Sequence, residues 1–341
     1  MTSGANKLRL GLIGAGIIAS EAHAPALERL GDKFEITAVC NRTEPKAAAL
    51  AGRFGLPRER IWTDWRLMLA QAPVDAVIIC LPIELNYPVS EAAVRAGKHV
   101  LCEKPAGRSL AEARASVSLG RGSAPTYMIA EDCHYAPAFT KAAELVAQGV
   151  VGRVNSILWS PMMFMDLTNK YARTTWRINH DYPGGYLLDG GVHNVHVLQM
   201  LAGPVESVKA EVRSVERGLG AVDHAFCLLN HRNGVLSSLN LSWQAHDSGE
   251  TPIKVFGREG TLIVESGRIV RIDPAGGQDE IGFEDEDAFY LEQLDFHRAA
   301  VSGQPPSCTV ESTAHDVAVV LALLDSAGND SSVRVEQVET G

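Results

Sequence analysis

The chain has 341 residues, of which 46% are hydrophobic and 21% charged, and its formal net charge at pH 7 is −10. This composition is typical of a globular protein with one large or two medium domains, and the negative charge argues against a nucleic-acid partner, which would require clustered Lys and Arg. No apolar run is long enough to span a bilayer, the first residues have no signal-peptide core, and the six cysteines are scattered, so we expect a cytoplasmic protein without a membrane partner.

A glycine-rich turn near the N-terminus is the first feature that points to a ligand. The apolar run Leu8–Ile13 reads as a buried strand that leads into Gly14-x-Gly16-x-x-Ala19 and then into a helix. In such a turn one glycine allows the tight bend, another lets a pyrophosphate approach the backbone, and the helix N-terminus offers N–H groups. The alternative is an ordinary βα turn that binds nothing. We expect a dinucleotide site that includes Gly14, Gly16, Ile17 and Ile18.

Strand and helix patterns alternate through the first third of the chain. Expected strands are Leu8–Ile13, Phe34–Cys40, Ala76–Leu81, His99–Cys102 and Thr126–Ala130, and expected helices are Glu21–Leu30, Glu44–Phe54, Tyr87–Ala96 and Leu110–Leu119. The run Ala76–Leu81 is apolar on both faces, as in a parallel sheet covered by helices. This succession predicts an α/β Rossmann domain with a doubly wound parallel sheet over residues 1–127.

The rhythm changes after a helix expected over Phe139–Gln148. Expected strands are Val154–Trp159, Val205–Val215, Ala225–Leu229, Val235–Trp243 and Ile253–Phe256. Short polar turns such as His231–Gly234 join the later strands, which predicts an open, mostly antiparallel sheet in a second α/β domain over residues 128–341. The acidic stretch Asp279–Asp287 reads as a solvated loop before a helix from about Ala288, and Ser312–Ser326 reads as a final amphipathic helix.

The end of the second expected strand bears on cofactor choice. It reads Cys40-Asn41-Arg42-Thr43, with no acidic residue until Glu44. NAD sites place Asp or Glu there to accept from the ribose hydroxyls, whereas NADP sites supply Arg for the 2′-phosphate. We therefore expect Asn41 and Arg42 to contact the cofactor and NADP to be preferred. NAD remains possible if Arg42 only stacks on the adenine.

A lysine follows another expected strand of the same sheet. Glu103-Lys104-Pro105 comes directly after His99–Cys102, at the edge of the sheet where ligands bind. A lysine held there can donate hydrogen bonds to a substrate hydroxyl or carbonyl, and its pKa falls readily on partial burial. The alternative is a surface turn at a strand end.

Longer motifs carry a resemblance. Ala96-Gly97-Lys98-His99-Val100 leads into Glu103-Lys104-Pro105, and the other motifs are His23-x-Pro25-Ala26-Leu27, Gly149-x-x-Gly152-Arg153-Val154 and the run from Gly184 to His193. Together they resemble the signature of the Gfo/Idh/MocA oxidoreductase family over most of the chain. The resemblance implies an NAD(P)-dependent dehydrogenase or reductase that transfers hydride between nicotinamide and a CH–OH or carbonyl carbon of a sugar, polyol or related small molecule. It further implies that the subunits form a homodimer or homotetramer.

The resemblance also assigns roles. The catalytic set of the family falls on Lys104, Asp189 and His193, with Lys104–Pro105 often joined by a cis peptide bond. Cofactor contacts are expected from Leu81, Pro82, Asn86, Glu103 and Lys104. The stretch Leu81–Asn86 departs from the Thr-Pro-Asn-x-x-His that the family often shows, so the contacts of its side chains near the nicotinamide are expected to differ.

The spacing of Asp189 and His193 also supports a shared site. They are four residues apart, so a helix from Gly190 to Leu201 would bring them to one face, where the carboxylate can orient an imidazole that handles a proton. His196 extends this face, and the three side chains could ligate a divalent metal. We expect instead that His196 packs or hydrogen-bonds beneath the site, and we predict no metal.

Four further residues are expected to face the substrate with His193. His134 and Tyr135 follow the strand Thr126–Ala130, and Trp176 and Arg177 precede Gly184 in a loop rich in aromatic and polar groups. Aromatic faces can cover sugar rings and Arg can donate paired hydrogen bonds to hydroxyls. Each could instead be a packed or solvated loop residue.

Two other functions remain open on the sequence. The first is a cofactor-binding regulator without turnover, against which the presence of Lys104, Asp189 and His193 argues. The second is a hydrolase or eliminase that uses NAD transiently, and members of the family with that chemistry usually lack the lysine.

Overall fold

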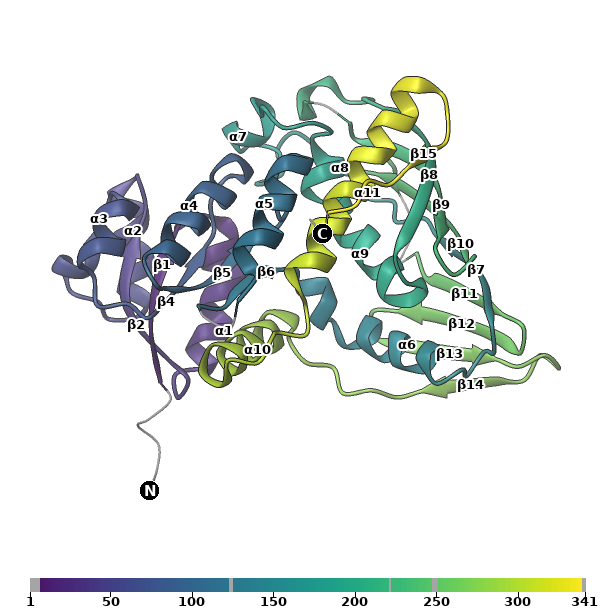
Figure 1. The fold of residues 1–341 in the computed structure, drawn as a ribbon, viewed down its shortest axis with the longest axis horizontal. Helices are drawn as coiled ribbons and strands as arrows, with labels where there is room; N and C mark the ends of the chain where they lie inside the picture. The colour runs from purple at the N-terminus through teal and green to yellow at the C-terminus, as the bar shows by residue number, and fades with distance from the viewer. Residues whose placement is uncertain (1–6, 123–124, 221, 247–250, 339–341) are drawn as a thin grey trace. The chain divides into compact units, whose positions relative to one another are not determined.

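The computed structural model describes residues 7–122, 125–220, 222–246 and 251–338, and the chain forms two compact units (Figure 1). The first unit comprises the segments ending at Gly107, Arg114–Asp132 and Asp287–Ala314, and the second comprises Arg108–Ala113, Cys133–Glu286 and the segment from His315. The sequence placed residues 128–341 together. The structure assigns Asp287–Ala314 to the first unit, because the helix it contains packs on the first helices of the chain.

The first unit is built on a six-stranded sheet in the order β3-β2-β1-β4-β5-β6, and all of its pairs are parallel. The strands are β1 Leu8–Ile13, β2 Phe34–Cys40, β3 Ile61–Trp62, β4 Ala76–Ile79, β5 His99–Glu103 and β6 Tyr127–Ala130. β4 is buried along its whole length, as its apolar sequence predicts. The doubly wound parallel sheet is confirmed, and β3 is the strand that the sequence did not reveal.

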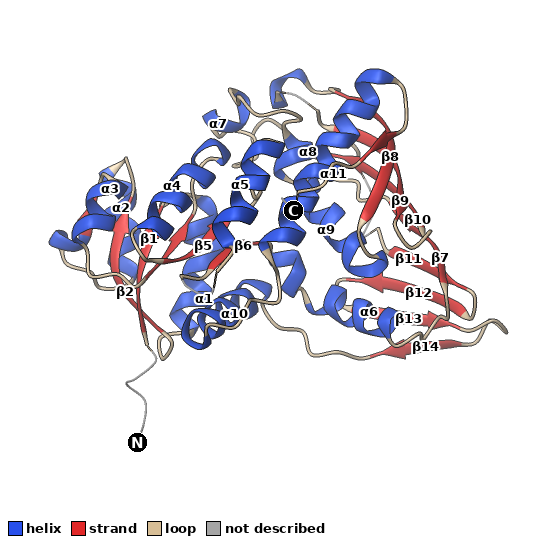
Figure 2. Ribbon diagram, viewed as in Figure 1, coloured by secondary structure: helices blue, strands red, loops and turns tan. Residues whose placement is uncertain are grey.

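Helices line this sheet and include one distant segment. They are η1 Ala19–His23, α1 Ala24–Arg29, α2 Glu44–Arg53, η2 Arg58–Arg60, α3 Trp65–Gln71, α4 Ile83–Arg95, α5 Leu110–Gly120 and α10 Ala288–Ser302. α2 and α3 pack on β2, and α4 packs on β4 and β5 (Figure 2). α10 packs on α1 and η1, with the rings of Phe296 and Phe34 stacked at a centroid distance of 6.4 Å. This burial explains why α10 belongs to the first unit.

The second unit contains a nine-stranded sheet in the order β14-β13-β12-β11-β7-β10-β9-β8-β15. The strands are β7 Val154–Trp159, β8 Val205–Arg213, β9 His224–His231, β10 Leu236–Ser242, β11 Ile253–Gly257, β12 Gly260–Glu265, β13 Arg268–Ile272, β14 Gln278–Ile281 and β15 Val333–Arg334. Only the pair of β7 with β10 is parallel, so the mostly antiparallel sheet is confirmed. The solvated loop expected from Asp279 is wrong at its start, because β14 pairs with β13 as an exposed, charged edge strand.

Helices cover one face of this second sheet. They and the short turns are η3 Asp132–Tyr135, α6 Pro137–Ala147, α7 Thr175–Ile178, α8 Tyr186–Asp189, α9 Gly191–Ala202, η4 Arg217–Leu219 and α11 Val310–Asn329. α6 packs on β12 and β13 and against α9, while α9 packs on β10 (Figure 2). Large apolar side chains of the sheet remain exposed within the chain, namely Leu158, Phe226, Leu228 and Leu236. Along β9 these exposed residues alternate with buried ones, so they belong to the face that α6 and α9 leave uncovered.

Candidate active site

The glycine-rich turn leaves backbone open to a ligand. Gly14 has φ +103°, and a Cβ at this position would lie 2.1 Å from the carbonyl oxygen of Cys80. A Cβ on Gly16 would meet nothing within 4 Å, and Gly16 is exposed just before the helical stretch that begins at Ile17. Gly14 is therefore required by close packing, whereas the space at Gly16 fits a pyrophosphate group that approaches the backbone.

Asn41 and Arg42 follow β2 beside this turn. The Oδ1 atom of Asn41 accepts a hydrogen bond from the backbone N–H of Ala15 at 3.1 Å, and its Nδ2 donates to the carbonyl of Thr43 at 3.0 Å. Asn41 thus ties the end of β2 to the glycine turn, and the side chain of Arg42 is exposed. Both predicted cofactor residues therefore lie at the carboxyl edge of the parallel sheet, as do Leu81 and Pro82 after β4.

Lys104 follows β5 at the same edge, and the Lys104–Pro105 peptide bond is cis, as the resemblance implies. Asn86 of α4 is 2% exposed, and its Nδ2 donates to the backbone carbonyls of Glu103 at 2.7 Å and Lys104 at 3.3 Å. The sequence placed Asn86 among the cofactor contacts. In the structure its amide fixes the backbone that carries Lys104, a contact that no sequence pattern indicates beyond the polar residue itself.

A buried polar chain holds the Glu103 side chain. The Nε2 atom of His23 lies 2.9 Å from Oε1 of Glu103, and the Nδ1 atom of the same ring lies 3.0 Å from Nε2 of Gln293 on α10. His23 and Gln293 have no exposed surface, and Glu103 is 7% exposed. The carboxylate of Glu103 contacts His23. Glu103 therefore helps to fix the end of the strand that precedes Lys104.

In the second unit the run from Gly184 forms two short helical pieces. α8 ends at Asp189, Gly190 follows, and α9 begins at Gly191 with His193 in its first turn. Asp189 is 6% exposed, and its Oδ2 accepts a hydrogen bond from Nε of Arg177 at 2.6 Å. The sequence assigned Asp189 to His193 and Arg177 to substrate, and it missed this ion pair. A cation beside the buried carboxylate compensates for its desolvation.

Two aromatic rings lie close to the guanidinium group of Arg177. Its Cζ atom lies 4.1 Å from the centre of the Trp176 ring and 5.2 Å from that of Tyr171. Two of the predicted substrate residues, Trp176 and Arg177, are thereby brought to Asp189. The cation–π contacts hold the guanidinium plane in place without using all of its hydrogen-bond donors.

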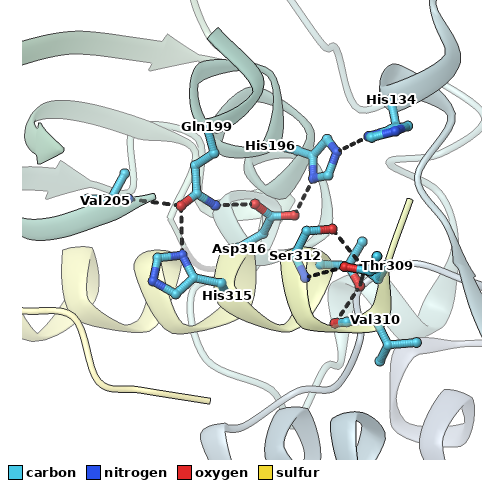
Figure 3. A network of polar contacts seen from close by, with 10 residues as sticks. His134, His196, Gln199, Val205, Thr309, Val310, Ser312, His315 and Asp316 are labelled. Atoms are coloured by element: carbon cyan, nitrogen blue, oxygen red, sulfur yellow. Dashed lines mark hydrogen bonds and ion pairs between the residues drawn. The ribbon is translucent and has the colours of Figure 1, made fainter. Parts of the chain in front are cut away.

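The turn η3 brings the other predicted substrate residues to α9. The Sγ atom of Cys133 lies within 4.8 Å of a ring nitrogen of His193, and Nδ1 of the adjacent His134 lies 2.9 Å from Nε2 of His196. The ring of Tyr135 packs against that of His134 at a centroid distance of 5.1 Å. His196 is 2% exposed, and its Nδ1 lies 2.7 Å from Oδ2 of Asp316 (Figure 3). The hydrogen-bonding expected of His196 is thus observed, with Asp316 as a partner that the sequence did not indicate.

Comparison with known proteins places these features in a family. Residues 8–130 match the model of the oxidoreductase family with an NAD-binding Rossmann fold, and residues 139–263 match that of the GFO/IDH/MocA C-terminal domain. The Saccharomyces cerevisiae protein YMR315W is 30% identical over 348 residues, which cover 97% of this chain and 99% of the yeast protein. The chain belongs to the Gfo/Idh/MocA family of oxidoreductases.

Other members of this Gfo/Idh/MocA family support the assignment. The D-xylose 1-dehydrogenase [NADP(+)] of Haloarcula marismortui is 27% identical, over 97% of this chain and 94% of the relative. The crystal structure of an oxidoreductase from Thermotoga maritima superimposes with a TM-score of 0.91 at 33% identity, over 98% of this chain and all of that one. The family resemblance, the fold class and the NAD(P)-dependent oxidoreductase activity predicted from the sequence are confirmed. Within the described part of the chain, no helix has the length and apolarity needed to cross a membrane.

Proposed function

We propose that this family member oxidises or reduces a sugar, polyol or related small molecule, with the first unit binding the cofactor and the second the substrate. The observation that carries the proposal is the carboxyl edge of the parallel sheet, where the open turn at Gly16 and the ammonium-bearing Lys104 both lie. The substrate class is supported by the printed activity of the D-xylose 1-dehydrogenase relative. A bound nicotinamide supplies the hydride acceptor or donor.

We assign the catalytic roles to Lys104, His193 and Asp189. The Lys104 ammonium donates hydrogen bonds to the reacting oxygen, and His193 takes or returns the hydroxyl proton. Asp189 orients the site with Arg177, whose Nε holds its Oδ2 at 2.6 Å. The proposed substrate contacts are His134, Tyr135, Trp176, Arg177 and His193.

The variants Lys104→Met and His193→Ala test these catalytic roles. Each should lower kcat by about 100-fold or more, because each removes a group that acts on the reacting oxygen. Cofactor affinity measured by calorimetry should change little. Near-normal turnover in both variants would show that the roles are wrong, and cofactor binding without turnover of any sugar or polyol would favour a regulator.

The preference for NADP is a further part of the proposal. Arg42 is exposed directly after β2, and the chain has no acidic residue there before Glu44. Arg42→Ala should reduce kcat/KM with NADP by about tenfold and leave the value with NAD nearly unchanged, since only NADP carries the 2′-phosphate. Arg95→Ala is the matched control, because its side chain is 76% exposed at the far end of α4. A preference for NAD that Arg42→Ala does not alter would contradict the assignment.

Assembly and location complete the proposal. The uncovered face of the second sheet exposes Leu158, Phe226, Leu228 and Leu236 by 46–58% within the chain, an apolar surface that a second subunit would bury. We therefore propose a homodimer or homotetramer, which light scattering would test. All six cysteines are free thiols, which supports a cytoplasmic location.

A further inference from the structure

The backbone on both sides of Lys104 is held by one side chain of α4, the helix that packs on β5. The Nδ2 atom of Asn86 donates to the carbonyl oxygen of Glu103 at 2.7 Å and to that of Lys104 at 3.3 Å. The first carbonyl belongs to the peptide group before the Cα atom of Lys104, and the second belongs to the peptide group after it. Because peptide groups are planar, one amide thus fixes both planes and, with them, the direction of the Cα–Cβ bond of Lys104.

The orientation of the Asn86 amide follows from its partners. Both partners are carbonyl oxygens, which can only accept, so the amide nitrogen must face them. An amide NH₂ group has two hydrogens, and each of them is used in one of these contacts. The side chain is 2% exposed, and its Oδ1 atom is buried without a hydrogen-bond partner among the described residues. Asn86 therefore has no donor left for a ligand.

The end of β5 has anchors of its own. β5 pairs with β6 as far as Glu103, which lies opposite Ala130. The carboxylate of Glu103 lies 2.9 Å from Nε2 of the buried His23. These contacts hold the strand end whether or not the amide is present. Lys104 is the first residue beyond the strand, so the orientation of its backbone is what depends most on Asn86.

We infer that Asn86 is a positioning residue that directs the Lys104 ammonium to the reacting oxygen and does not itself contact the cofactor. This inference rests on the proposed function, in which Lys104 donates to that oxygen. A lysine carries its charge at the end of a flexible four-carbon stem, so a small rotation at Cα produces a large displacement at Nζ. A displacement of about 1 Å in an active site can lower the rate by about 100-fold.

A pair of matched truncations on α4 tests the inference. Asn86→Ala removes both donors, and Val89→Ala is the control, because Val89 has no exposed surface and its side chain makes no hydrogen bond. Both variants should lower the melting temperature. Only Asn86→Ala should lower kcat, by about tenfold, with D-xylose or with the sugar or polyol of a panel that the wild type oxidises fastest. An equal loss of kcat in both variants would overturn the inference, since loosening of α4 would then explain it.

A double-mutant cycle shows whether Asn86 acts through Lys104. In the Lys104→Met background the ammonium is gone, so adding Asn86→Ala should change kcat by less than about twofold. A further tenfold loss in that background would mean that Asn86 acts elsewhere, which would overturn the inference. Asn86→Leu removes the same donors and keeps most of the volume, so the cycle is repeated with this variant if Asn86→Ala does not fold.

Cofactor affinity distinguishes a positioning residue from a cofactor contact. Calorimetry with NADP and with NAD should give Kd values for Asn86→Ala within about twofold of those of the wild type, because both amide hydrogens are used inside the protein. A tenfold rise in Kd with either cofactor would assign Asn86 to cofactor binding and overturn the inference.

The outcomes also separate this inference from the proposed function. Absence of turnover with every sugar and polyol, or normal kcat in Lys104→Met, would reject the proposed function and the inference with it. A low kcat in Lys104→Met together with a normal kcat in Asn86→Ala would reject the inference alone.

Discussion

Each of the two units contains a buried histidine that contacts a carboxylate, and the two differ in what the second ring nitrogen meets. His23 of the first unit lies 2.9 Å from Glu103, and His196 of the second lies 2.7 Å from Asp316. The other nitrogen of His23 lies 3.0 Å from Nε2 of Gln293, whereas that of His196 lies 2.9 Å from a second imidazole.

Both rings donate to their carboxylate, but the donating nitrogen is Nε2 in His23 and Nδ1 in His196. Nε2 of Gln293 also lies 3.3 Å from the carbonyl oxygen of His23, so the amide donates, Nδ1 of His23 accepts, and its proton sits on Nε2. The chain in the first unit ends at an amide that cannot titrate. In the second unit the contact next to His196 is a second imidazole, that of His134. A histidine–carboxylate pair therefore braces a strand end in the first unit and links two helices, α9 and α11, in the second.

The comparison predicts its largest effect on stability at His23. His23→Ala leaves the carboxylate of Glu103 without its ring partner and opens a cavity at a position with no exposed surface, so we expect a loss of about 3–5 kcal/mol in the free energy of unfolding. Urea denaturation measures it. His246→Ala, at an exposed position, should change stability by less than about 0.5 kcal/mol. Equal effects of the two variants would mean that His23 does not brace the first unit.

A second prediction concerns the pH dependence of stability and His315 of the second unit. Burial, followed by the charges of Arg232 and His231, lowers the pKa of His315 from 6.5 to about 4. Because the unfolded chain binds this proton at higher pH than the folded protein, stability should fall as pH decreases from about 6.5 to 4. The loss from this group amounts to roughly 3 kcal/mol.

His315→Asn isolates that contribution. Asparagine can keep the donation to Oε1 of Gln199 but does not titrate, so the variant should lose less stability on acidification than the wild type. Urea denaturation at a series of pH values compares the two. Parallel curves for wild type and variant would show that His315 carries no pH-dependent stability.

A smaller effect on stability is expected at Glu292, which precedes Gln293 on α10 of the first unit. Glu292 of α10 is fully buried, neither of its carboxylate oxygens has a hydrogen-bond partner among the described residues, and burial together with the charge of Asp132 raises its pKa well above 4.5. Its folded form holds a proton that the unfolded chain releases, so it costs stability as pH rises above 4.5.

Glu292→Gln should therefore stabilise the protein by about 1–2 kcal/mol at pH 8 and by less at pH 5, as measured by denaturation at both values. Glu144→Gln, on the exposed side of α6, is the control without an expected gain. A loss of stability in Glu292→Gln at pH 8 would indicate that the carboxylate has a partner.

Local pattern was sufficient for much of the fold. β1, β2 and β7 have the bounds expected from their sequence runs, because a Lys or Arg precedes each run and Gly14, Asn41 or Ser160 follows it. β3 has only two residues and β14 is charged and exposed, so neither carries a pattern that could reveal it. The place of α10 in the first unit depends on packing across more than 250 residues of sequence, which no local signal encodes.

In the candidate site, too, some residues could be predicted from the sequence and some contacts could not. Lys104, Asp189 and His193 could be selected because motif and residue chemistry coincide at each. The partner of His196 is 120 residues away on another helix, and Asn86 acts through two backbone carbonyls, so sequence alone could not connect them. The ion pair of Arg177 with Asp189 joins two residues that were predicted separately, Arg177 as a substrate contact and Asp189 as a partner of His193.

Transfer of a carbon-bound deuterium tests the central claim most directly. The wild-type protein is incubated with NADP or NAD and carbon-deuterated sugars and polyols, and the reduced cofactor is analysed by NMR. The account predicts deuterium at C4 of the nicotinamide with at least one substrate, and a rate of deuterium transfer about 100-fold lower in Lys104→Met. Cofactor that binds but remains oxidised with every substrate, or reduced cofactor that carries only solvent hydrogen, would contradict it.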